Sequence, residues 1–315
     1  MAATLQGAAR SGYRSMGIGS SGAMDHFAMK AANYLTGNES AATVIEINFP
    51  APEILFLQNA FISITGADFG AAVNDSAVPN WTLLFVKKNS ILHFKKPVSG
   101  ARAYIAVHNG WQAMQWLNSY STHLKATAGG YGGRVLQKDD VIEFTVTDCS
   151  LEENKIFPWH ISDKELDKIY QPKNNIRFIK GVEWDLLDDD SKAIFKNSNF
   201  IVSEQSDRMG YRLSGPSLLL QQPIELISSA TDTGIVQLLP EGNCIILMAD
   251  HQTTGGYPRI ASVIKADLPK LAQAGPGSRI NFTGVSLQEA ESTFTQMQKI
   301  LTEIKNACHL NFKKI

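Results

Sequence analysis

The sequence contains few cysteines, no long apolar run and almost no net charge. Its three cysteines, Cys149, Cys244 and Cys308, lie far apart and lack the close spacing of a zinc site, so we expect reduced thiols and no disulfide framework. The 29 Lys and Arg residues nearly balance 30 Asp and Glu residues, which favours neither nucleic acid nor an anionic membrane as a partner. The sequence shows no signal-peptide core and no spanning segment of about 18 apolar residues, so we expect a soluble cytoplasmic protein.

Several familiar catalytic and cofactor motifs are also missing. The sequence has no GxxxxGK[ST] loop, so we do not expect this chain to supply a phosphate loop for ATP, and its seven histidines show no HExxH-like spacing, so no metal is predicted. The tetrapeptide AMKA at 28–31 is close to the one around a biotinylated lysine. Helical periodicity places Lys30 on a solvated helix face instead, so no biotin attachment site is expected. The SSG at 20–22 does not fit a nucleophile elbow, and Ser20 or Ser21 is better interpreted as a helix N-cap.

Short runs of β-branched and aromatic residues dominate the sequence and predict a mainly β protein with few helices. The expected strands lie within 42–49, 53–57, 60–66, 81–86, 90–94, 101–107, 140–146, 175–180, 200–204, 233–239, 244–249, 259–264 and 279–283. Residues 151–174 are charged and irregular, as in a linker with a short helix. We therefore predict two β domains, 1–150 and 175–315, joined by this linker; the 44% hydrophobic content is enough to fill a core in each.

Two helices have clear signals. Residues 23–35 place Met24, Phe27, Ala28, Ala31 and Leu35 on one face, and Gly37 follows where a helix would end. A second helix is expected to begin at Ser286, because Glu289 three residues later completes a capping box. Its apolar stripe comprises Leu287, Ala290, Phe294, Met297, Leu301 and Ile304. At under three heptads, this stripe favours packing on the chain's own barrel over a coiled coil.

Three polar stretches are candidate sites, each with a purely structural alternative. In GSSGAMDHFAMKAAN (19–33), backbone N–H groups at a helix start are suited to an anion, but capping alone also explains the pattern. In SDRMGYRLSGP (206–216), Arg208 and Arg212 suit a carboxylate or phosphate, or else make two surface salt bridges. In HQTTGGYP (251–258), three polar side chains precede two glycines that let backbone amides approach a ligand, although a turn is equally compatible.

Five motifs in fixed order resemble the C-subunit family of 5-oxoprolinase. They are YRSMGIGSSGAMDHFAMKAANYLTGN, ITGADF, SGARAYIAV, SDRMGYRLSGP and HQTTGGYPRIASVIKADLP, and the resemblance runs from Thr4 to about Ala290. This family is related to the second allophanate-hydrolase-type subunit and to a carboxyltransferase half-domain of urea carboxylase. The resemblance implies two carboxyltransferase subdomains of cyclophilin-like β-barrel fold. It also implies a sister subunit of related fold and a larger lactam-utilisation-type subunit, which together open 5-oxo-L-proline to L-glutamate with ATP bound through the complex.

The same resemblance implies roles for particular residues. The catalytic group would be Asp25, Arg208, Gln252 and Thr253, with Asp25 orienting water and Gln252 and Thr253 serving an oxyanion. The substrate-binding group would be Ser21, Arg212, Thr254, Gly255, Gly256 and Tyr257. Two other functions stay open: a biotin-dependent carboxyltransferase component of the urea carboxylase or allophanate type, and a regulatory binding protein like a relative that antagonises a kinase inhibitor.

The sequence departs from the family pattern mainly in its first half. Where the pattern reads TxQDxGRxGYR, this chain has TLQGAARSGYR, so Gly7 replaces a carboxylate and Ala9 a glycine. Tyr120 replaces an arginine in a GSRST-like segment, and KDD at 138–140 replaces a GD pair. In the second half, His251 stands where the pattern has arginine before QTTGGYP.

Overall fold

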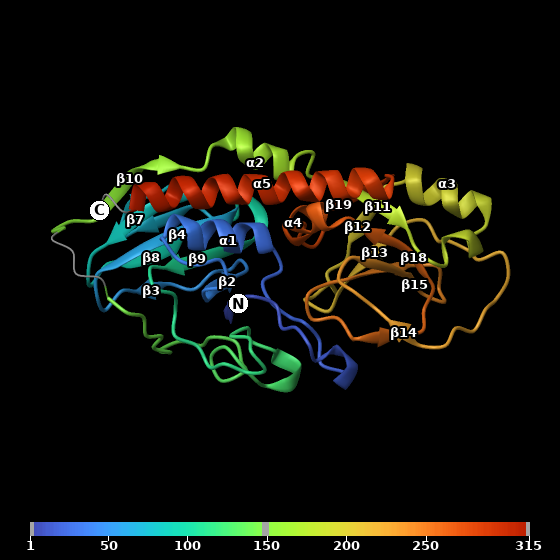
Figure 1. Cartoon of the computed structure of the whole chain (residues 1–315), viewed down its shortest axis with the longest axis horizontal. Coiled ribbons are helices and arrows are strands. Elements are labelled where there is room, and N and C mark those ends of the chain that lie inside the picture. The colour runs from blue at the N-terminus through green and yellow to red at the C-terminus, as the bar shows by residue number, and fades with distance from the viewer. Residues whose placement is uncertain (1–2, 147–150, 313–315) are drawn as a thin grey trace. The chain divides into compact units, whose positions relative to one another are not determined.

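The structure is a computed structural model that describes residues 3–146 and 151–312 (Figure 1). Strands dominate the described residues, which confirms the mainly β prediction. The α-helices are α1 (His26–Leu35), α2 (Asp163–Tyr170), α3 (Asp189–Asn197), α4 (Leu268–Ala272) and α5 (Leu287–Phe312). Single 3₁₀ turns are η1 (Arg14–Met16), η2 (Leu124–Ala126), η3 (Trp184–Leu186) and η4 (Lys265–Asp267). In the part of the chain that the structure describes, no helix is long and apolar enough to cross a membrane.

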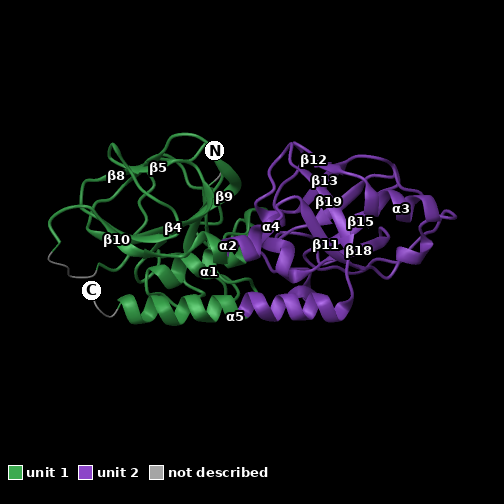
Figure 2. Ribbon diagram, turned by 90° about the horizontal axis from the view of Figure 1, so that it is seen from above, with its two compact units in different colours: residues 1–10, 25–165, 299–315 green, residues 11–24, 166–298 purple. Residues whose placement is uncertain are grey.

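The chain divides into two compact units, coloured separately in Figure 2. Unit 1 comprises Met1–Arg10, Asp25–Glu165 and Lys299–Ile315, and unit 2 comprises Ser11–Met24 and Leu166–Gln298. Residues 11–24 are grouped with unit 2 because they pack there; Met24, for example, is 4% exposed within the core of unit 2. The domain boundaries expected from the sequence stay a prediction.

Unit 1 contains two antiparallel sheets. The six-stranded sheet has the order β1 (Ala3–Gln6), β2 (Val44–Ile47), β9 (Ser99–Val107), β4 (Ala60–Asp68), β7 (Thr82–Val86) and β10 (Lys155–His160). The four-stranded sheet has the order β3 (Ile54–Leu55), β8 (Ile91–Phe94), β5 (Ala71–Val73) and β6 (Ser76–Ala77). Helix α1 lies on β4, where the hydroxyls of Ser63 and Thr65 donate to the carbonyls of Ala32 and Ala28, each at 2.8 Å. These buried side-chain bonds add directional contacts to the apolar packing between helix and sheet.

Helix α1 begins later than expected and has a different cap. Asp25 is the N-cap, and its Oδ1 accepts from the Ala28 N–H at 2.9 Å, so the expectation that Ser20 or Ser21 caps the helix is wrong. The aspartate succeeds because it directly precedes the helical residues and its carboxylate reaches the third N–H. At the other end, Gly37 has a φ of 74° and donates to the Tyr34 carbonyl, as predicted. Lys30 is half-buried, and this burial lowers its pKa, so it is not the fully solvated lysine that the periodicity predicted.

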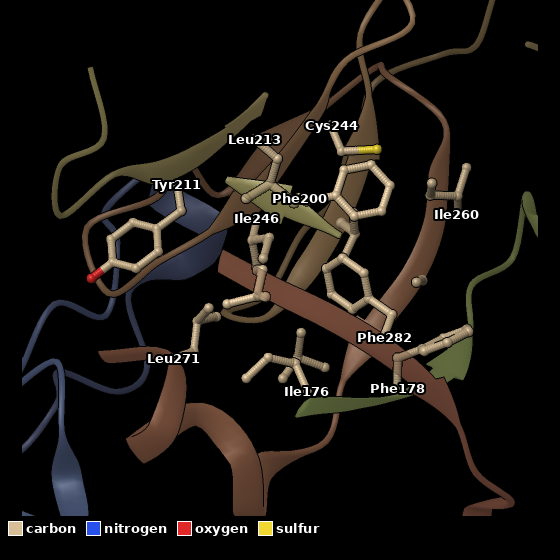
Figure 3. Close-up of a cluster of buried hydrophobic side chains, with 14 of the residues drawn as sticks. Ile176, Phe178, Phe200, Tyr211, Leu213, Cys244, Ile246, Ile260, Leu271 and Phe282 are labelled. Carbon is tan, nitrogen blue, oxygen red and sulfur yellow. The ribbon is translucent and has the colours of Figure 1, made fainter. Parts of the chain in front are cut away.

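Unit 2 is a closed seven-stranded barrel. Its order is β11 (Asn175–Lys180), β18 (Arg259–Val263), β15 (Ile235–Leu238), β16 (Cys244–Leu247), β13 (Gly210–Ser214), β12 (Phe200–Val202) and β19 (Arg279–Gly284). The barrel encloses an apolar core, part of which is drawn in Figure 3. Phe282 of β19 lies among this core and stacks on Phe195 of α3 with ring centroids 4.4 Å apart. A separate two-stranded pair, β14 (Ser229–Ala230) with β17 (Thr254–Gly255), lies outside the barrel ladder.

Helix α5 has the capping box that its sequence predicts. The Ser286 N–H donates to Glu289 Oε2 at 2.7 Å, and the Glu289 N–H donates back to Ser286 Oγ at 3.2 Å. Met297, Leu301 and Ile304 of the predicted stripe are buried, whereas Leu287 is 62% exposed, so the stripe begins later than expected. The unit boundary falls within this helix, between residues 298 and 299.

One predicted strand is wrong. Residues 140–146 form no strand, and Phe144 makes only an isolated bridge to Trp111. Their alternating pattern is not explained by a ladder: Val141 is 61% and Val146 39% exposed, while Phe144 packs edge-on against the Trp111 ring with centroids 5.4 Å apart. Ile142 and Phe144 therefore pack this loop against the core of unit 1. Cys149, one of the three cysteines, lies outside the described residues.

Candidate functional site

The HQTTGGYP segment is a loop in unit 2 between barrel strands β16 and β18. Within it, β17 pairs with β14, opposing Thr254 to Ala230 and Gly255 to Ser229. The Thr231 N–H extends this pairing by donating to the Thr253 carbonyl at 3.0 Å. Gln252, Thr254 and Tyr257 are exposed, whereas Thr253 is 8% exposed. The segment is thus a loop that pairs with β14 through one short strand, and its polar side chains lie partly at the surface and partly beneath it.

His251 anchors the start of this loop from a buried position. It is 2% exposed, and its Nδ1 lies 2.6 Å from the Gln252 carbonyl oxygen, which also accepts a bond from the Thr231 hydroxyl. A carbonyl only accepts, so this contact assigns the ring proton to Nδ1. Burial lowers the pKa of His251 below its ordinary value, against opposing effects of the Gln252 carbonyl and Asp232. In the neutral ring, Nε2 therefore carries no proton and can only accept a hydrogen bond.

Gln237 lies beneath Gly255 of the loop. It is 1% exposed in strand β15, and a side chain on Gly255 would place its Cβ 2.7 Å from Gln237 Nε2. Only glycine fits that approach without displacing the carboxamide. Neither Gln237 Nε2 nor His251 Nε2 has a hydrogen-bond partner among residues 3–146 and 151–312. Buried polar atoms are usually paired, so these two nitrogens are unusual for a folded interior.

Arg208 fixes the residue that precedes the loop. Its Nε and Nη2 donate to the two carboxylate oxygens of Asp250 at 2.8 and 3.1 Å, and Nη2 also donates to the Gly22 carbonyl at 2.6 Å. The Asp250 N–H returns a bond to the Arg208 carbonyl at 2.8 Å. The guanidinium fork thus holds a carboxylate of the chain itself, which is the salt-bridge alternative weighed from the sequence.

A second ion pair supports the far end of the loop. Arg259, the first residue of β18, donates through Nη2 to Glu183 Oε1 at 2.7 Å and through Nε to Oε2 at 3.0 Å. The Arg259 guanidinium holds the pKa of the Glu183 carboxyl below its usual value, although partial burial opposes this effect. The loop is therefore clamped by a bidentate arginine pair at each end.

The predicted site residues do not all converge. Gln252, Thr253, Thr254, Gly255, Gly256 and Tyr257 share the loop, and Arg208 holds its start. Arg212 is exposed and alternates on β13 with the core residues Tyr211 and Leu213, so it points away from the barrel interior. Ser21 is 4% exposed, has a φ of 51° and precedes the Gly22 carbonyl that binds Arg208. The roles assigned to these residues stay predictions.

Asp25 differs from the other nine predicted residues because it belongs to unit 1. Its side chain is completely buried and caps α1, and its N–H donates to the Tyr104 hydroxyl at 2.7 Å. Tyr104 in turn donates to Glu46 Oε2 at 2.9 Å. Burial raises the pKa of Tyr104 well above its ordinary value, with Glu46 adding to the effect. The phenol therefore stays protonated and can maintain both bonds.

Known proteins share this sequence pattern over nearly its whole length. The chain belongs to the carboxyltransferase domain family, subdomain A and B, which matches residues 16–284. Within it, the chain falls in the C-subunit family of 5-oxoprolinase. It is 38% identical over 303 residues to the 5-oxoprolinase C-subunit of Haemophilus influenzae, covering 96% of this chain and 94% of that protein. It is 35% identical over 310 residues to the Escherichia coli protein of the same name, covering 98% of this chain and 96% of that protein.

Solved structures show the same fold in a longer chain. The K. lactis urea amidolyase superposes with a TM-score of 0.88 at 26% identity, over 96% of this chain. The chain spans only 19% of the amidolyase, about one fifth of its length. The structural similarity is therefore to one part of the urea amidolyase.

The sequence did not reveal Gln237 and Thr231, which lie next to the loop, or the hydrogen bond between His251 and the Gln252 carbonyl. Gln237 carries a signal in the sequence, because an amide interrupts the apolar run TGIVQLL of a buried strand. The sequence carries no comparable signal for Thr231. Their proximity to Gly255 arises from the pairing of β14 with β17, which the sequence pattern does not specify.

Proposed function

We propose that this chain is one subunit of an ATP-dependent 5-oxoprolinase complex that opens 5-oxo-L-proline to L-glutamate in the cytoplasm. The main support is the end-to-end correspondence with two proteins named as the C-subunit of 5-oxoprolinase, each covered over at least 94% of its length. In contrast, the chain matches only 16% of the Saccharomyces cerevisiae urea amidolyase. The chain thus corresponds to the two C-subunits over nearly their whole length, which supports the proposal.

The chemistry requires activation before water attacks. A lactam carbonyl is a poor electrophile because of amide resonance. Transfer of the γ-phosphoryl group of ATP to the amide oxygen makes C5 attackable; addition of water and cleavage of the C5–N bond, with the ring nitrogen taking a proton, open the ring. A second water releases phosphate from the resulting acyl phosphate. The protein contributes orientation and fixed donors for the developing negative charge.

We assign the binding part of this task to the HQTTGGYP loop of unit 2. Gln252 and the backbone of Gly255 and Gly256 supply N–H donors at a loop held by the Arg208–Asp250 and Arg259–Glu183 pairs. Rigid support of this kind preserves donor geometry during a reaction. ATP and the remaining catalytic groups are assigned to the assembled complex, with a sister subunit of related fold and a larger lactam-utilisation-type subunit as partners.

Reconstitution tests the proposal. The purified chain alone should release no glutamate from 5-oxo-L-proline and ATP, and glutamate release should appear when both proposed partners are added. The measurement is enzymatic detection of glutamate together with ADP. Turnover by the isolated chain, after removal of contaminating partners, or no turnover by the three-component mixture, contradicts the proposal.

Carboxyl transfer is the second candidate, and the carboxyltransferase family match with the 0.88 TM-score to urea amidolyase favours it. In that case the same loop would hold carboxybiotin or a urea-like amide, with biotin attached to a partner. Incubation with a biotin carboxylase, a biotinylated carrier, ATP and ¹⁴C-bicarbonate distinguishes the two functions. Labelled carboxylated urea supports carboxyl transfer, whereas unlabelled glutamate from 5-oxoproline supports the first proposal.

A further inference from the structure

Two successive carbonyls of the HQTTGGYP loop are held by one residue, Thr231. The Thr231 hydroxyl donates to the Gln252 carbonyl, and the Thr231 N–H donates to the Thr253 carbonyl at 3.0 Å. His251 Nδ1 lies 2.6 Å from the Gln252 carbonyl oxygen and donates to it as well. Both lone pairs of that oxygen are therefore occupied, and both carbonyls point toward Thr231.

Thr231 is in turn fixed by its neighbours in the chain. It is 1% exposed, and the Ala230 carbonyl before it accepts from Arg259 Nη1 at 3.3 Å. Asp232 after it pairs with Arg14 at 3.2 Å. The two loop carbonyls are thus held by a buried residue whose own backbone is tied on both sides.

The direction of the carbonyls fixes the direction of two N–H groups. The C=O and N–H bonds of a planar trans peptide point in opposite directions, and the peptides 252–253 and 253–254 are trans. The N–H of Thr253 lies opposite the Gln252 carbonyl, and the N–H of Thr254 lies opposite the Thr253 carbonyl. Both N–H groups therefore point away from Thr231, on the same side of the chain.

The loop departs from a regular ladder at this point. The backbone bends at Thr253. A regular antiparallel pair would have the Thr253 N–H donate to the Thr231 carbonyl, and the described residues form no such bond. Thr254 lies opposite Ala230, next to the Thr231–Thr253 bond, where an antiparallel strand directs its N–H outward. Because β17 pairs only with β14 among the described residues, the outward side is an open strand edge.

This open edge is suited to a single uncharged oxygen. Gln252 and Thr254 are exposed, so the segment lies at the surface, although Thr253 is 8% exposed. Two adjacent N–H groups that point the same way form a small donor site for one oxygen, as in nests and oxyanion holes. The guanidinium groups of Arg208 and Arg259 on either side of the loop are each engaged by a carboxylate of the chain. The donor pair therefore fits a carbonyl oxygen better than a carboxylate.

We propose that the N–H groups of Thr253 and Thr254 bind the carbonyl oxygen of a neutral amide, and that Thr231 is the positioning residue that orients them. A carbonyl oxygen has two lone pairs, so one oxygen accepts both bonds. This assignment deepens the proposed function and rests on it for the identity of the amide as the lactam of 5-oxo-L-proline.

NMR titration of the full ¹⁵N-labelled chain tests the donor pair with two halves of 5-oxo-L-proline. 2-Pyrrolidinone retains the lactam and lacks the carboxylate, whereas cyclopentanecarboxylate retains the carboxylate and lacks the lactam. With 2-pyrrolidinone, the amide proton resonances of Thr253 and Thr254 should shift downfield and saturate; with cyclopentanecarboxylate they should not move. Unless both resonances shift with 2-pyrrolidinone the proposal is overturned, and equal shifts with the carboxylate overturn the choice of a carbonyl oxygen.

Thr231→Val tests the positioning role, because it removes the hydroxyl and retains the N–H. The Gln252 carbonyl then loses one of its two bonds, while the Thr253 carbonyl stays held. We expect the ligand-induced shift of Thr253 to fall by at least half, the shift of Thr254 to remain, and the affinity for 2-pyrrolidinone to fall about fivefold. Thr231→Ser retains the hydroxyl and should restore the wild-type values. If Thr231→Val leaves both shifts and the affinity unchanged, Thr231 does not orient the donors.

Thr82→Val is the matched control in unit 1. The Thr82 hydroxyl is also buried and donates to a backbone carbonyl, that of Trp159, at 2.8 Å. This variant should lower the melting temperature about as much as Thr231→Val while leaving both amide shifts as in wild type. If Thr82→Val reduces the Thr253 shift equally, the effect of Thr231→Val reflects lost stability, which contradicts a positioning role.

Failure of the proposed function gives a different result. If the chain is not part of a 5-oxoprolinase, reconstituted mixtures release no glutamate, but the amide shifts with 2-pyrrolidinone stay as stated. If only the donor pair is wrong, the reconstituted complex turns over 5-oxo-L-proline, Thr231→Val leaves its KM within twofold of wild type, and the two resonances do not move. If both are right, Thr231→Val raises KM about fivefold with kcat nearly unchanged, because the weakened bond is to bound substrate.

Discussion

Thr253 is the residue of the candidate loop whose side chain best separates a ligand role from a structural one. It is 8% exposed, and its carbonyl, not its hydroxyl, forms the backbone bond to Thr231. Thr253→Val nearly preserves shape and retains that backbone bond. If the hydroxyl serves the ligand, glutamate release by the reconstituted complex should fall about tenfold or more, with the melting temperature close to wild type. A lower melting temperature with full activity would identify a purely structural turn.

His251 should make stability depend on pH. Its pKa is lowered in the folded state by burial, so the folded chain favours the neutral ring and the unfolded chain, with an ordinary pKa of about 6.5, binds the proton first. This contribution is complete above pH 6.5 and is lost as pH falls below it, by up to about 1.4 kcal/mol per pH unit.

The variant His251→Asn removes the titrating ring while keeping the charges that act on it, those of Asp232, Asp250 and Arg14. We expect the melting temperature of the wild type, relative to the variant, to decrease between pH 7.5 and pH 5.5. Differential scanning calorimetry of both proteins across this range measures it. A constant difference between the two proteins would mean that His251 titrates normally in the fold.

Asp25 stabilises unit 1 through its cap. Replacing it by Ala removes the acceptor for the Ala28 N–H, and loss of an N-cap costs about 1 kcal/mol. We expect Asp25→Ala to lower the melting temperature by a few degrees and Asp25→Asn, which keeps an acceptor oxygen, to lower it less. If the two variants unfold at the same temperature, the cap contributes nothing measurable. Glutamate release by the complex containing Asp25→Asn then tests the predicted role of the carboxylate in orienting water.

At the scale of elements, the capping box of α5 is a reciprocal unit. Ser286 and Glu289 each satisfy the other's N–H, and these bonds lower the pKa of the Glu289 carboxyl. Ser286→Ala and Glu289→Ala should each destabilise the chain, and the double variant should lose less than the sum of the two. Urea denaturation of the four proteins measures this coupling. Additive losses would show that the two bonds act independently.

The β14–β17 pairing is the element on which the candidate site depends. It is short, it lies outside the barrel ladder, and the two ion pairs of Arg208 and Arg259 fix the chain on either side of the loop. The pairing is held further by the Thr231 N–H, which donates to the Thr253 carbonyl at 3.0 Å, and by Arg259 of β18, whose Nη1 donates to the Ala230 carbonyl at 3.3 Å.

At the scale of the whole molecule, the proposed function requires a partner. The chain and a sister subunit of related fold, co-expressed and passed over a size-exclusion column at micromolar concentration, should elute as one complex. The physical reason is that a subunit without its own phosphate loop must share the substrate with the protein that binds ATP. Consistent separate elution would count against the assembly.

The sequence by itself determined the elements whose signals are local. The residues of β11 (Asn175–Lys180) match the predicted run, and the Ser286–Glu289 capping box starts α5 as predicted, because these signals depend on neighbouring residues. The family also followed from motifs in fixed order. The tertiary structure decided that residues 140–146 form a loop packed on the core through Ile142 and Phe144, because a strand needs a partner ladder.

Tertiary structure also decided what the candidate residues contact. The sequence placed Arg208 in a candidate anion clamp, whereas folding puts the Asp250 carboxylate within its reach. The barrel strand β15 places Gln237 Nε2 beneath Gly255, 18 positions later in the chain, and the contact with Thr231 lies 20 positions before His251. Periodicity predicts which side chains are buried, but the partners of a buried polar atom depend on strands distant in sequence.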